Sequence, residues 1–317
     1  GRKRGIANYC QSPMAAMAVA SAMHQAAAQK ASTISHCVRR NAELFTDEVL
    51  DMLPLLLSAA GGYPGSFLEI GANTGTDGSQ TYLLERCFGW KGLLVEAQPR
   101  TFAKLEQSPR TSTKIWAAAC SNGRMIRMLN VSVQGAASPD FGNIKAVIGR
   151  LERRFGKMGT VEVPCREMQA MMQENGFATL DFASIDVQGA EDAVLKTVDP
   201  RRFQVVLVEL EGLDSRSQTR LVAVRKLLEG AGLVPVLLPV PWYRYKGSGY
   251  NELYIQPTLR NASEIRPSQM YGRQRSCVSR HTALERFRCF AEYHSSRTRE
   301  TRIGEVLSAL EPVLGAG

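Results

Sequence analysis

Residues 66–81, SFLEIGANTGTDGSQT, decide the fold because they set a glycine-rich turn directly after a short apolar run. The run at 66–70 has the length and composition of a buried strand, and the glycines that follow break it. In an open parallel sheet, ligands bind outside the carboxyl ends of the strands, near the point where strand order reverses. Glycines there let the backbone approach a ligand closely, and the next helix offers its N-terminal N–H groups. The stretch therefore predicts a ligand-binding turn.

Strand-like and helix-like segments alternate from residue 67 onward. The apolar runs SFLEI, GLLVEA, KIWAAA, FASIDV, QVVLVEL and LVPVLL indicate buried strands. Helical patterns lie between several of them, at 80–86, 100–106, 165–174, 190–197 and 217–229. This alternation predicts an α/β fold with a mainly parallel sheet covered by helices on both faces. A last run, NELYIQP from residue 251, follows after too short a gap for a crossover helix, so it is predicted to join the sheet edge antiparallel.

The net charge of +9 resides in the two ends of the chain. Residues 1–40 hold six Lys or Arg and no acid, and residues 258–317 hold ten Arg and six Glu, which leaves 23 basic and 24 acidic residues for 41–257. A net charge of −1 argues against nucleic-acid binding by the central part. We therefore divide the chain into a basic, Ala-rich leader (1–41), a central domain (42–257) and an Arg-rich extension (258–317).

Neither end has a pattern that settles its structure. The leader suits a transit peptide, an Ala-rich helix or a disordered segment. A helix is predicted within 41–60, and two helix-like segments with apolar residues that could face the main domain or a partner lie beyond residue 280. The longest apolar runs are shorter than the roughly 18 to 20 residues that span a bilayer, so no membrane span is expected.

Cysteine usage predicts an intracellular protein, cytoplasmic or, if the leader is a transit peptide, organellar, and histidine usage predicts no metal site. All four histidines lie outside 41–257, so the central domain has no histidine ligand set and no imidazole base. The odd number of cysteines, without metal-ligand spacing, indicates reduced thiols. They are Cys10, Cys37, Cys87, Cys120, Cys165, Cys277 and Cys289.

Two carboxylates discriminate between cofactors. Glu69 stands two residues before Gly71, where it would repel the pyrophosphate of a dinucleotide, and no GK[ST] follows for a phosphate-binding loop. S-adenosylmethionine has no phosphate, and an acidic residue beside the turn suits its ammonium group. Glu96 ends the second predicted strand, 25 residues after Gly71, where a carboxylate can accept both ribose hydroxyls. The alternative is a plain tight turn with Glu96 at the start of a solvated loop.

A third carboxylate follows another buried strand, in LDFASIDVQGAED at 180–192. The strand delivers Asp186 to the same carboxyl edge, and Gly189 with Ala190 lets a helix begin close by. Asp186 is therefore a site candidate, and its alternative role is a helix cap. Glu191 is expected to favour the helix dipole.

These motifs in this order resemble the FkbM-type methyltransferases, which are S-adenosylmethionine-dependent O-methyltransferases. FLEIGANTGTDGSQTYLLERCFGWKGLLVEAQP, VPCREMQAMM, LDFASIDVQGAEDAVLKTVDP and NELYI carry the likeness, over about 65–257. It implies a class I, Rossmann-like, doubly wound sheet of seven strands with the last antiparallel, and methylation of a hydroxyl on a sugar or a secondary metabolite. Many members have Glu at the position of Gln188. The implied cofactor-binding residues are Glu69, Gly71, Ala72, Asn73, Gly75, Asp77, Ser79, Thr81, Glu96, Ala119, Ser121 and Gln188.

The expected reaction is displacement at the sulfonium methyl by a substrate oxygen. Asp186 is expected either to accept the hydroxyl proton or to position the hydroxyl while water takes the proton. Substrate contacts are expected from the insertion at 128–159 and from the loop PVPWYRYKGSGYN, which is alternatively a packed corner. Competing functions are an RNA or protein methyltransferase, a dehydrogenase, which the turn's glycine spacing disfavours, and a non-catalytic binding module. The candidate substrate residues are Trp242, Tyr243, Arg244 and Tyr245.

Overall fold

The computed structural model of the chain describes most of the central region and the helix before it. The described residues are 13–41, 47–61, 64–121, 123–129, 159–187, 189–211, 215–236, 249–259, 301, 303–304 and 307–308.

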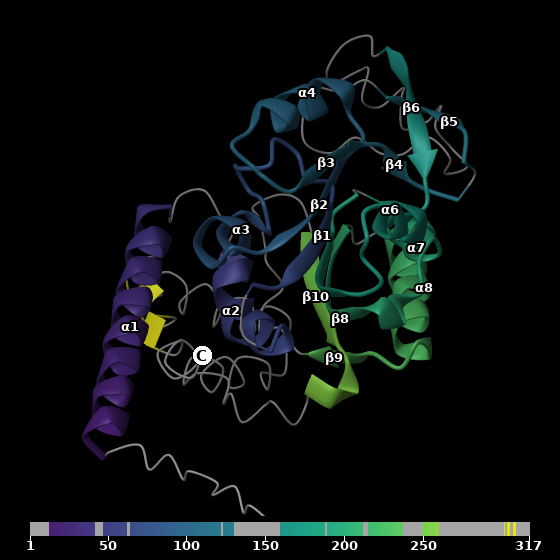
Figure 1. Cartoon of the computed structure of the whole chain (residues 1–317). Helices are drawn as coiled ribbons and strands as arrows, with labels where there is room; N and C mark the ends of the chain where they lie inside the picture. The colour runs from purple at the N-terminus through teal and green to yellow at the C-terminus, as the bar shows by residue number, and fades with distance from the viewer. Residues whose placement is uncertain are drawn as a thin grey trace, which may run out of the picture.

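A seven-stranded sheet forms the centre of the protein (Figure 1). Strands β3, β2, β1, β7 and β8 run parallel to one another, and β10 runs antiparallel to both of its neighbours, β8 and β9. This confirms the predicted α/β class, the mainly parallel seven-stranded sheet and the antiparallel last strand. In spatial order the strands are β3 (Thr113–Trp116), β2 (Lys91–Glu96), β1 (Ser66–Ile70), β7 (Leu180–Ile185), β8 (Phe203–Glu211), β10 (Gly249–Ile255) and β9 (Val234–Val236).

The place predicted for the last strand is wrong. β10 does not lie at the edge of the sheet; it lies between β8 and β9, and β9 forms that edge. The sequence shows that 249–255 has no crossover helix before it, which sets its direction. The sequence does not show that β9 forms one position away from β8, so that β10 can pair between them.

Helices cover both faces of the sheet (Figure 1). Consecutive strand residues point to opposite faces, so Phe67 joins the core beneath α2 and α3, whereas Leu68 joins the core beneath α6, α7 and α8. Both cores are fully buried along the inner strands, which explains why these strands read as continuous apolar runs. The helices are α1 (Pro13–Arg40), α2 (Asp47–Ala59), α3 (Tyr82–Phe88), α4 (Pro99–Gln107), α6 (Met168–Glu174), α7 (Glu191–Leu195) and α8 (Ser215–Gly230), with a 3₁₀ turn at Pro200–Arg202.

A second, three-stranded sheet lies beyond the edge of the main sheet, in the order β4 (Ala118–Ala119), β6 (Thr160–Arg166) and β5 (Met125–Leu129). The sequence analysis expected one strand in KIWAAA and a helix from residue 165. Instead β3 and β4 belong to different sheets, and β6 continues through Arg166 before α6 begins. Alternation in β6 buries Val163 and Cys165, and a helical pattern that overlaps its end conceals this strand.

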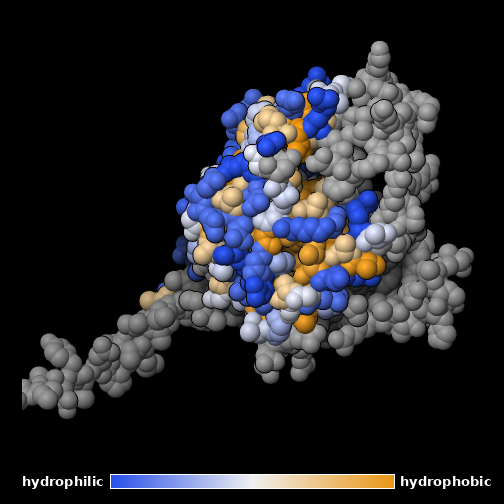
Figure 2. Space-filling model, turned by 90° about the vertical axis from the view of Figure 1, so that its right-hand side faces the viewer, coloured by the Kyte–Doolittle hydropathy of each residue, from blue (hydrophilic) through white to orange (hydrophobic). Residues whose placement is uncertain are grey.

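The outer surface near α6, α7 and α8 is largely hydrophilic, with smaller hydrophobic areas between (Figure 2). Three large hydrophobic side chains are exposed among the described residues, Trp116, Met125 and Val222. No helix in the described part of the chain is long and apolar enough to cross a membrane.

Segments from both ends of the chain pack on the α2 face of the sheet. The described part of the leader forms a helix, α1, which was one of its expected alternatives. Ile34 and Val38 on α1 are buried in the core with α2 and α3. Ile303 and Leu307, from the Arg-rich extension, join the same core. The first of the two helix-like segments expected beyond residue 280 lies outside the described part.

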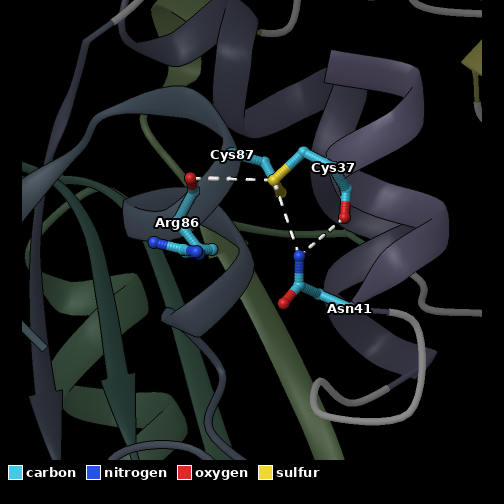
Figure 3. Close-up of a disulfide and its surroundings, with 4 residues drawn as sticks. All are labelled: Cys37, Asn41, Arg86 and Cys87. Carbon is cyan, nitrogen blue, oxygen red and sulfur yellow. Dashed lines mark hydrogen bonds between the residues drawn. A yellow bond between two sulfur atoms is a disulfide. The ribbon is translucent and has the colours of Figure 1, made fainter. Parts of the chain in front are cut away.

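A disulfide joins α1 to the end of α3 (Figure 3). Cys37 on α1 bonds Cys87, and the amide Nδ2 of Asn41 donates to the Cys37 carbonyl at 2.8 Å. The Cys37 sulfur lies 3.7 Å from the carbonyl oxygen of Arg86, which is a contact, since a bonded sulfur has no proton to donate. A covalent link therefore holds α1 against the domain.

The expectation of reduced thiols is wrong for four of the seven cysteines. Besides the α1–α3 disulfide, Cys120 after β4 bonds Cys165 on β6. Both pairs are separated by about fifty residues or slightly fewer in sequence, so only the folded chain reveals them. An odd total excludes complete pairing within one chain, and it does not exclude two separate bonds.

Removal of the α1–α3 disulfide will destabilise the protein. The bond closes a loop of 50 residues, and the chain-entropy relation then gives a loss of about 4 kcal/mol in the free energy of unfolding for the double variant Cys37→Ser, Cys87→Ser. Denaturant unfolding without a reducing agent measures this loss. A reducing agent should lower the stability of the wild type toward that of the variant. Equal stability of the two proteins under oxidising conditions would contradict the assignment.

Candidate active site

Three parallel strands end together at the carboxyl edge of the sheet. In the strand register, Ile70 of β1 pairs with Val95 of β2 and with Ile185 of β7. The next residues along these strands, 71, 96 and 186, therefore emerge side by side. The structure thus brings together the turn and the two carboxylates that the sequence analysis singled out separately.

The backbone at Gly71 packs directly against the neighbouring strand. Its N–H and that of Ala72 both donate to the carbonyl of Val95, at 2.9 and 3.0 Å, and Asp186 N–H donates to the carbonyl of Ile70 at 3.0 Å. Gly71 has φ +84°, and a Cβ there would lie 1.9 Å from the carbonyl oxygen of Asp186. No side chain fits at residue 71, both because of its φ and because of this approach.

Asn73 is also left-handed, with φ +49°, a conformation that asparagine tolerates better than most residues. Its N–H points at the Glu96 carboxylate, with Asn73 N to Glu96 Oε2 at 2.9 Å. Gln98 N–H donates to the other oxygen, Oε1, at 2.7 Å. Backbone groups on both sides thus orient the Glu96 carboxylate at the turn.

Burial raises the pKa of Glu96 to about 7. Its side chain is 8% exposed. The hydrogen bonds from the backbone lower the pKa and the nearby charge of Asp186 raises it, and burial is the largest effect. The carboxylates of Glu96 and Asp186, on the two strands that flank β1, are therefore close enough to interact electrostatically, and Glu96 changes its charge near neutral pH. Asp186 itself is half-buried.

Glu191, the first residue of α7, adds a third carboxylate near this edge. It is fully buried, its Oε1 accepts from Gly189 N at 2.6 Å, and its Oε2 lies 3.8 Å from Arg220 Nε. Burial raises its pKa, and the charge of Asp186 adds to that rise. In the part of the chain that the structure describes, no group of three or more acidic, Cys or His residues is arranged to hold a metal ion.

Glu69 bonds within the turn. Its carboxylate accepts hydrogen bonds from Ser79 Oγ at 2.9 Å, Gln80 N at 2.7 Å and Thr81 Oγ1 at 2.5 Å. Burial raises its pKa, and the charge of Arg110 opposes that rise. Glu69, Ser79 and Thr81 therefore form one buried cluster that shapes residues 71–81, and a direct contact between Glu69 and a ligand remains a prediction.

The other predicted cofactor residues lie at varying depth. Gly75 is buried in the turn and its N–H donates to Ala72 O at 2.8 Å, whereas Asp77 is exposed. Ala119 is buried on β4, and Ser121 is exposed just beyond it. Gln188 and the substrate candidates Trp242, Tyr243, Arg244 and Tyr245 lie outside the described residues, as does 130–158, most of the insertion.

Arg110 is the residue that the sequence analysis missed. It stands between α4 and β3, in the polar stretch SPRTST, and is 5% exposed. It donates to Gly75 O, Ser79 Oγ and Thr81 Oγ1. No motif marks this arginine, because its partners are about 30 residues earlier in the chain and are assembled only by folding.

Comparison with known protein families identifies the family of the chain. Residues 69–234, more than half of the chain, match the Methyltransferase FkbM domain family. Among curated proteins none matches in sequence.

Among solved structures, similar folds include a putative O-methyltransferase from Klebsiella pneumoniae (14% identity, 72% of this chain and 90% of that one, TM-score 0.32). Another is the O-methyltransferase from Bacillus cereus in complex with SAH (14% identity, 71% and 91%, TM-score 0.32). A third is precorrin-6y C5,15-methyltransferase from Geobacter metallireducens (13% identity, 64% and 86%, TM-score 0.33). The family match confirms the resemblance read from the motifs. The chain therefore belongs to the FkbM methyltransferase family, whose methyl donor is S-adenosylmethionine.

Proposed function

We propose that this methyltransferase is O-directed and transfers the methyl group to a hydroxyl of a sugar or a secondary metabolite. The observation that carries the proposal is the meeting of Gly71, Glu96 and Asp186 at one edge of the sheet, through the register of β1, β2 and β7. One carboxylate is oriented by the turn, and the other is half-buried beside it.

The residues of the turn fit the cofactor. Close backbone packing at Gly71 leaves no side chain to block a ligand, and no basic side chain of the described turn is present to hold a pyrophosphate. Glu96 keeps acceptor capacity beyond its bonds from Asn73 and Gln98, and a carboxylate with that capacity suits ribose hydroxyls. We assign Glu96 to the ribose and the backbone of residues 71–75 to the methionine part.

Asp186 is assigned to the acceptor hydroxyl. The cofactor, when bound, supplies a methyl group already activated by a sulfonium. The protein then has to hold the acceptor oxygen in line and take up or direct its proton. Among the described carboxylates of the carboxyl edge, Asp186 and Glu209 are half-buried, Glu191 is fully buried and Glu96 faces the turn. Of the two half-buried groups, Asp186 follows β7, the strand that pairs directly with β1 and its turn, whereas Glu209 is on β8. Asp186 is therefore the base, or it orients the hydroxyl toward water.

The acceptor class rests on what is known of the family and on the expected aromatic loop at 239–251. A protein or RNA acceptor would use the same cofactor edge, and the net charge of −1 for residues 41–257 disfavours RNA. A binding module without turnover is the third alternative, and the turnover experiment below separates it.

The disulfides bear on the proposed compartment. Structural disulfides persist mainly in oxidising compartments and are rare in the cytosol. Of the two expected locations, cytoplasmic and organellar, the bonds at Cys37–Cys87 and Cys120–Cys165 favour an oxidising organelle.

Turnover tests the assignment of Asp186. The wild type, given S-adenosylmethionine carrying a labelled methyl group and a panel of hydroxylated sugars and metabolites, should label at least one acceptor. Asp186→Asn should reduce turnover about a hundredfold or more and leave the Kd for S-adenosylhomocysteine within a few-fold. Asp192→Asn is the matched control, since Asp192 pairs with Lys196 on α7 and should leave turnover unchanged. Near-normal turnover by Asp186→Asn would eliminate it as the base.

The raised pKa of Glu96 predicts opposite effects of pH on cofactor affinity and on stability. Ribose hydroxyls need the ionised carboxylate, so affinity should fall as pH drops below about 7, approaching tenfold per pH unit. In the ligand-free protein, the raised pKa means that protonated Glu96 contributes stability that is fully present below pH 4.5 and lost as pH rises through about 7.

Calorimetric titration of S-adenosylhomocysteine from pH 5.5 to 8.5 measures the affinity. Glu96→Gln should bind more weakly at pH 8 and lose most of the pH dependence. Glu252→Gln, a change in a carboxylate paired with Arg225, should retain both the affinity and its pH dependence. The same pH dependence in the wild type and in Glu96→Gln would contradict the ribose assignment.

A further inference from the structure

Arg110 connects the loop before β3 to the cofactor turn. Its Nη1 donates to Gly75 O at 2.7 Å and to Ser79 Oγ at 3.0 Å, and its Nη2 donates to Thr81 Oγ1 at 2.8 Å. The planar guanidinium thus holds three points of residues 71–81 at once. The Arg110 side chain is only 1% exposed, so it contacts the buried side of the turn.

The turn is tightly packed where Arg110 reaches it. Gly75 has φ +79°, and a Cβ there would lie 2.5 Å from Leu105 Cδ1 and 3.3 Å from Arg110 Cγ. The rings of Phe67 and Tyr82 lie 5.6 and 5.7 Å from the guanidinium carbon, within the range of cation–π attraction. Arg110 therefore has one well-defined position, and the carbonyl of Gly75 is held with it.

Arg110 also lies between two carboxylates, that of the buried Glu69 and that of the half-buried Glu85. Its Nε donates to Glu85 Oε2 at 3.0 Å, and its Nη1 lies 3.9 Å from Glu69 Oε2. Although burial opposes it, the charge of Arg110 is the largest effect holding the pKa of Glu85 below its usual value. Without this cation, both carboxylates would lose the charge that compensates them, which is costly for groups largely withdrawn from water.

Glu85 anchors the segment that carries Arg110. It accepts from Thr111 N at 2.5 Å and from Ser112 Oγ at 2.6 Å. Glu85 lies on α3, which begins directly after the turn. The turn, α3 and the loop before β3 are therefore joined in one hydrogen-bonded network in which Arg110 is the shared member.

We infer that Arg110 is a positioning residue of the cofactor site, which holds residues 71–81 in the shape that receives S-adenosylmethionine before the ligand arrives. The inference rests on the proposed function of that turn. A ligand that meets a preformed turn does not have to order it. Loss of Arg110 therefore weakens cofactor binding and leaves the transfer step largely unchanged once the cofactor is bound.

The geometry distinguishes arginine from lysine at this position. Lysine supplies the charge that Glu69 and Glu85 require, but its single ammonium cannot reach the three acceptors in the turn with the geometry of a planar fork. The Arg110→Lys variant should therefore fold, but its turn should lack the three hydrogen bonds that the guanidinium donates. Arg110→Met removes both the charge and the fork.

The test compares these variants with Arg225→Met by calorimetry with S-adenosylhomocysteine, thermal unfolding and steady-state kinetics. Arg225 also pairs with a glutamate, Glu252, but through α8 and β10. Arg110→Lys should raise the Kd and the KM for the cofactor tenfold or more, with kcat at saturation within about threefold. Arg225→Met should lower the unfolding temperature and leave the Kd unchanged.

Three results would overturn the inference. One is a wild-type Kd in both Arg110 variants, another is a loss in kcat without a change in Kd, and the third is a Kd that rises in Arg225→Met in proportion to its loss of stability. Failure of the wild type to bind S-adenosylhomocysteine would instead overturn the proposed function, and the inference with it. The two failures are therefore distinguishable.

Discussion

The close approach of β1 to β7 at residue 71 is the constraint on which the site depends. A Cβ at residue 71 would lie 1.9 Å from the carbonyl oxygen of Asp186, so the strand ends can approach this closely only if residue 71 is glycine. This contact places the turn, Glu96 and Asp186 at a common edge. The position agrees with the general rule that ligands of open α/β sheets bind where parallel strands end.

The carboxylates near this edge belong to two groups, one compensated by Arg110 and one, that of Glu96, in which no such cation among the described residues is a leading cause of the pKa shift. On one side, Arg110 compensates Glu69 and Glu85, and the result is a fixed scaffold for the turn. On the other side, the charge of Asp186 acts on Glu96, and burial raises the pKa of Glu96 to about 7. Perturbed carboxylates next to a rigid support are typical of functional sites, although ion-pair networks also produce them. We propose that the first part holds the shape of the turn and that the second part meets the ligand.

Local patterns predicted much of this arrangement. The apolar runs and the glycines after residue 70 predicted the parallel sheet, the turn and the positions of Glu96 and Asp186, because each depends on residues adjacent in sequence. The features that were missed depend on distant residues. Arg110 meets the turn across about 30 residues, the two disulfides close loops of 50 and 45 residues, and the insertion of β10 between β8 and β9 depends on the order of the whole sheet. The role expected for Glu69 illustrates the same limit, since the sequence shows its place beside the turn and not the three donors that surround it.

The most direct test of the central claim is calorimetric titration of the purified protein with S-adenosylmethionine, S-adenosylhomocysteine and NAD at pH 8, with Glu96→Ala in parallel. The account predicts micromolar binding of the two adenosyl ligands, no binding of NAD, and a loss of about 1 to 3 kcal/mol in the variant. Binding of NAD, or no binding of either adenosyl ligand to folded protein, would contradict it.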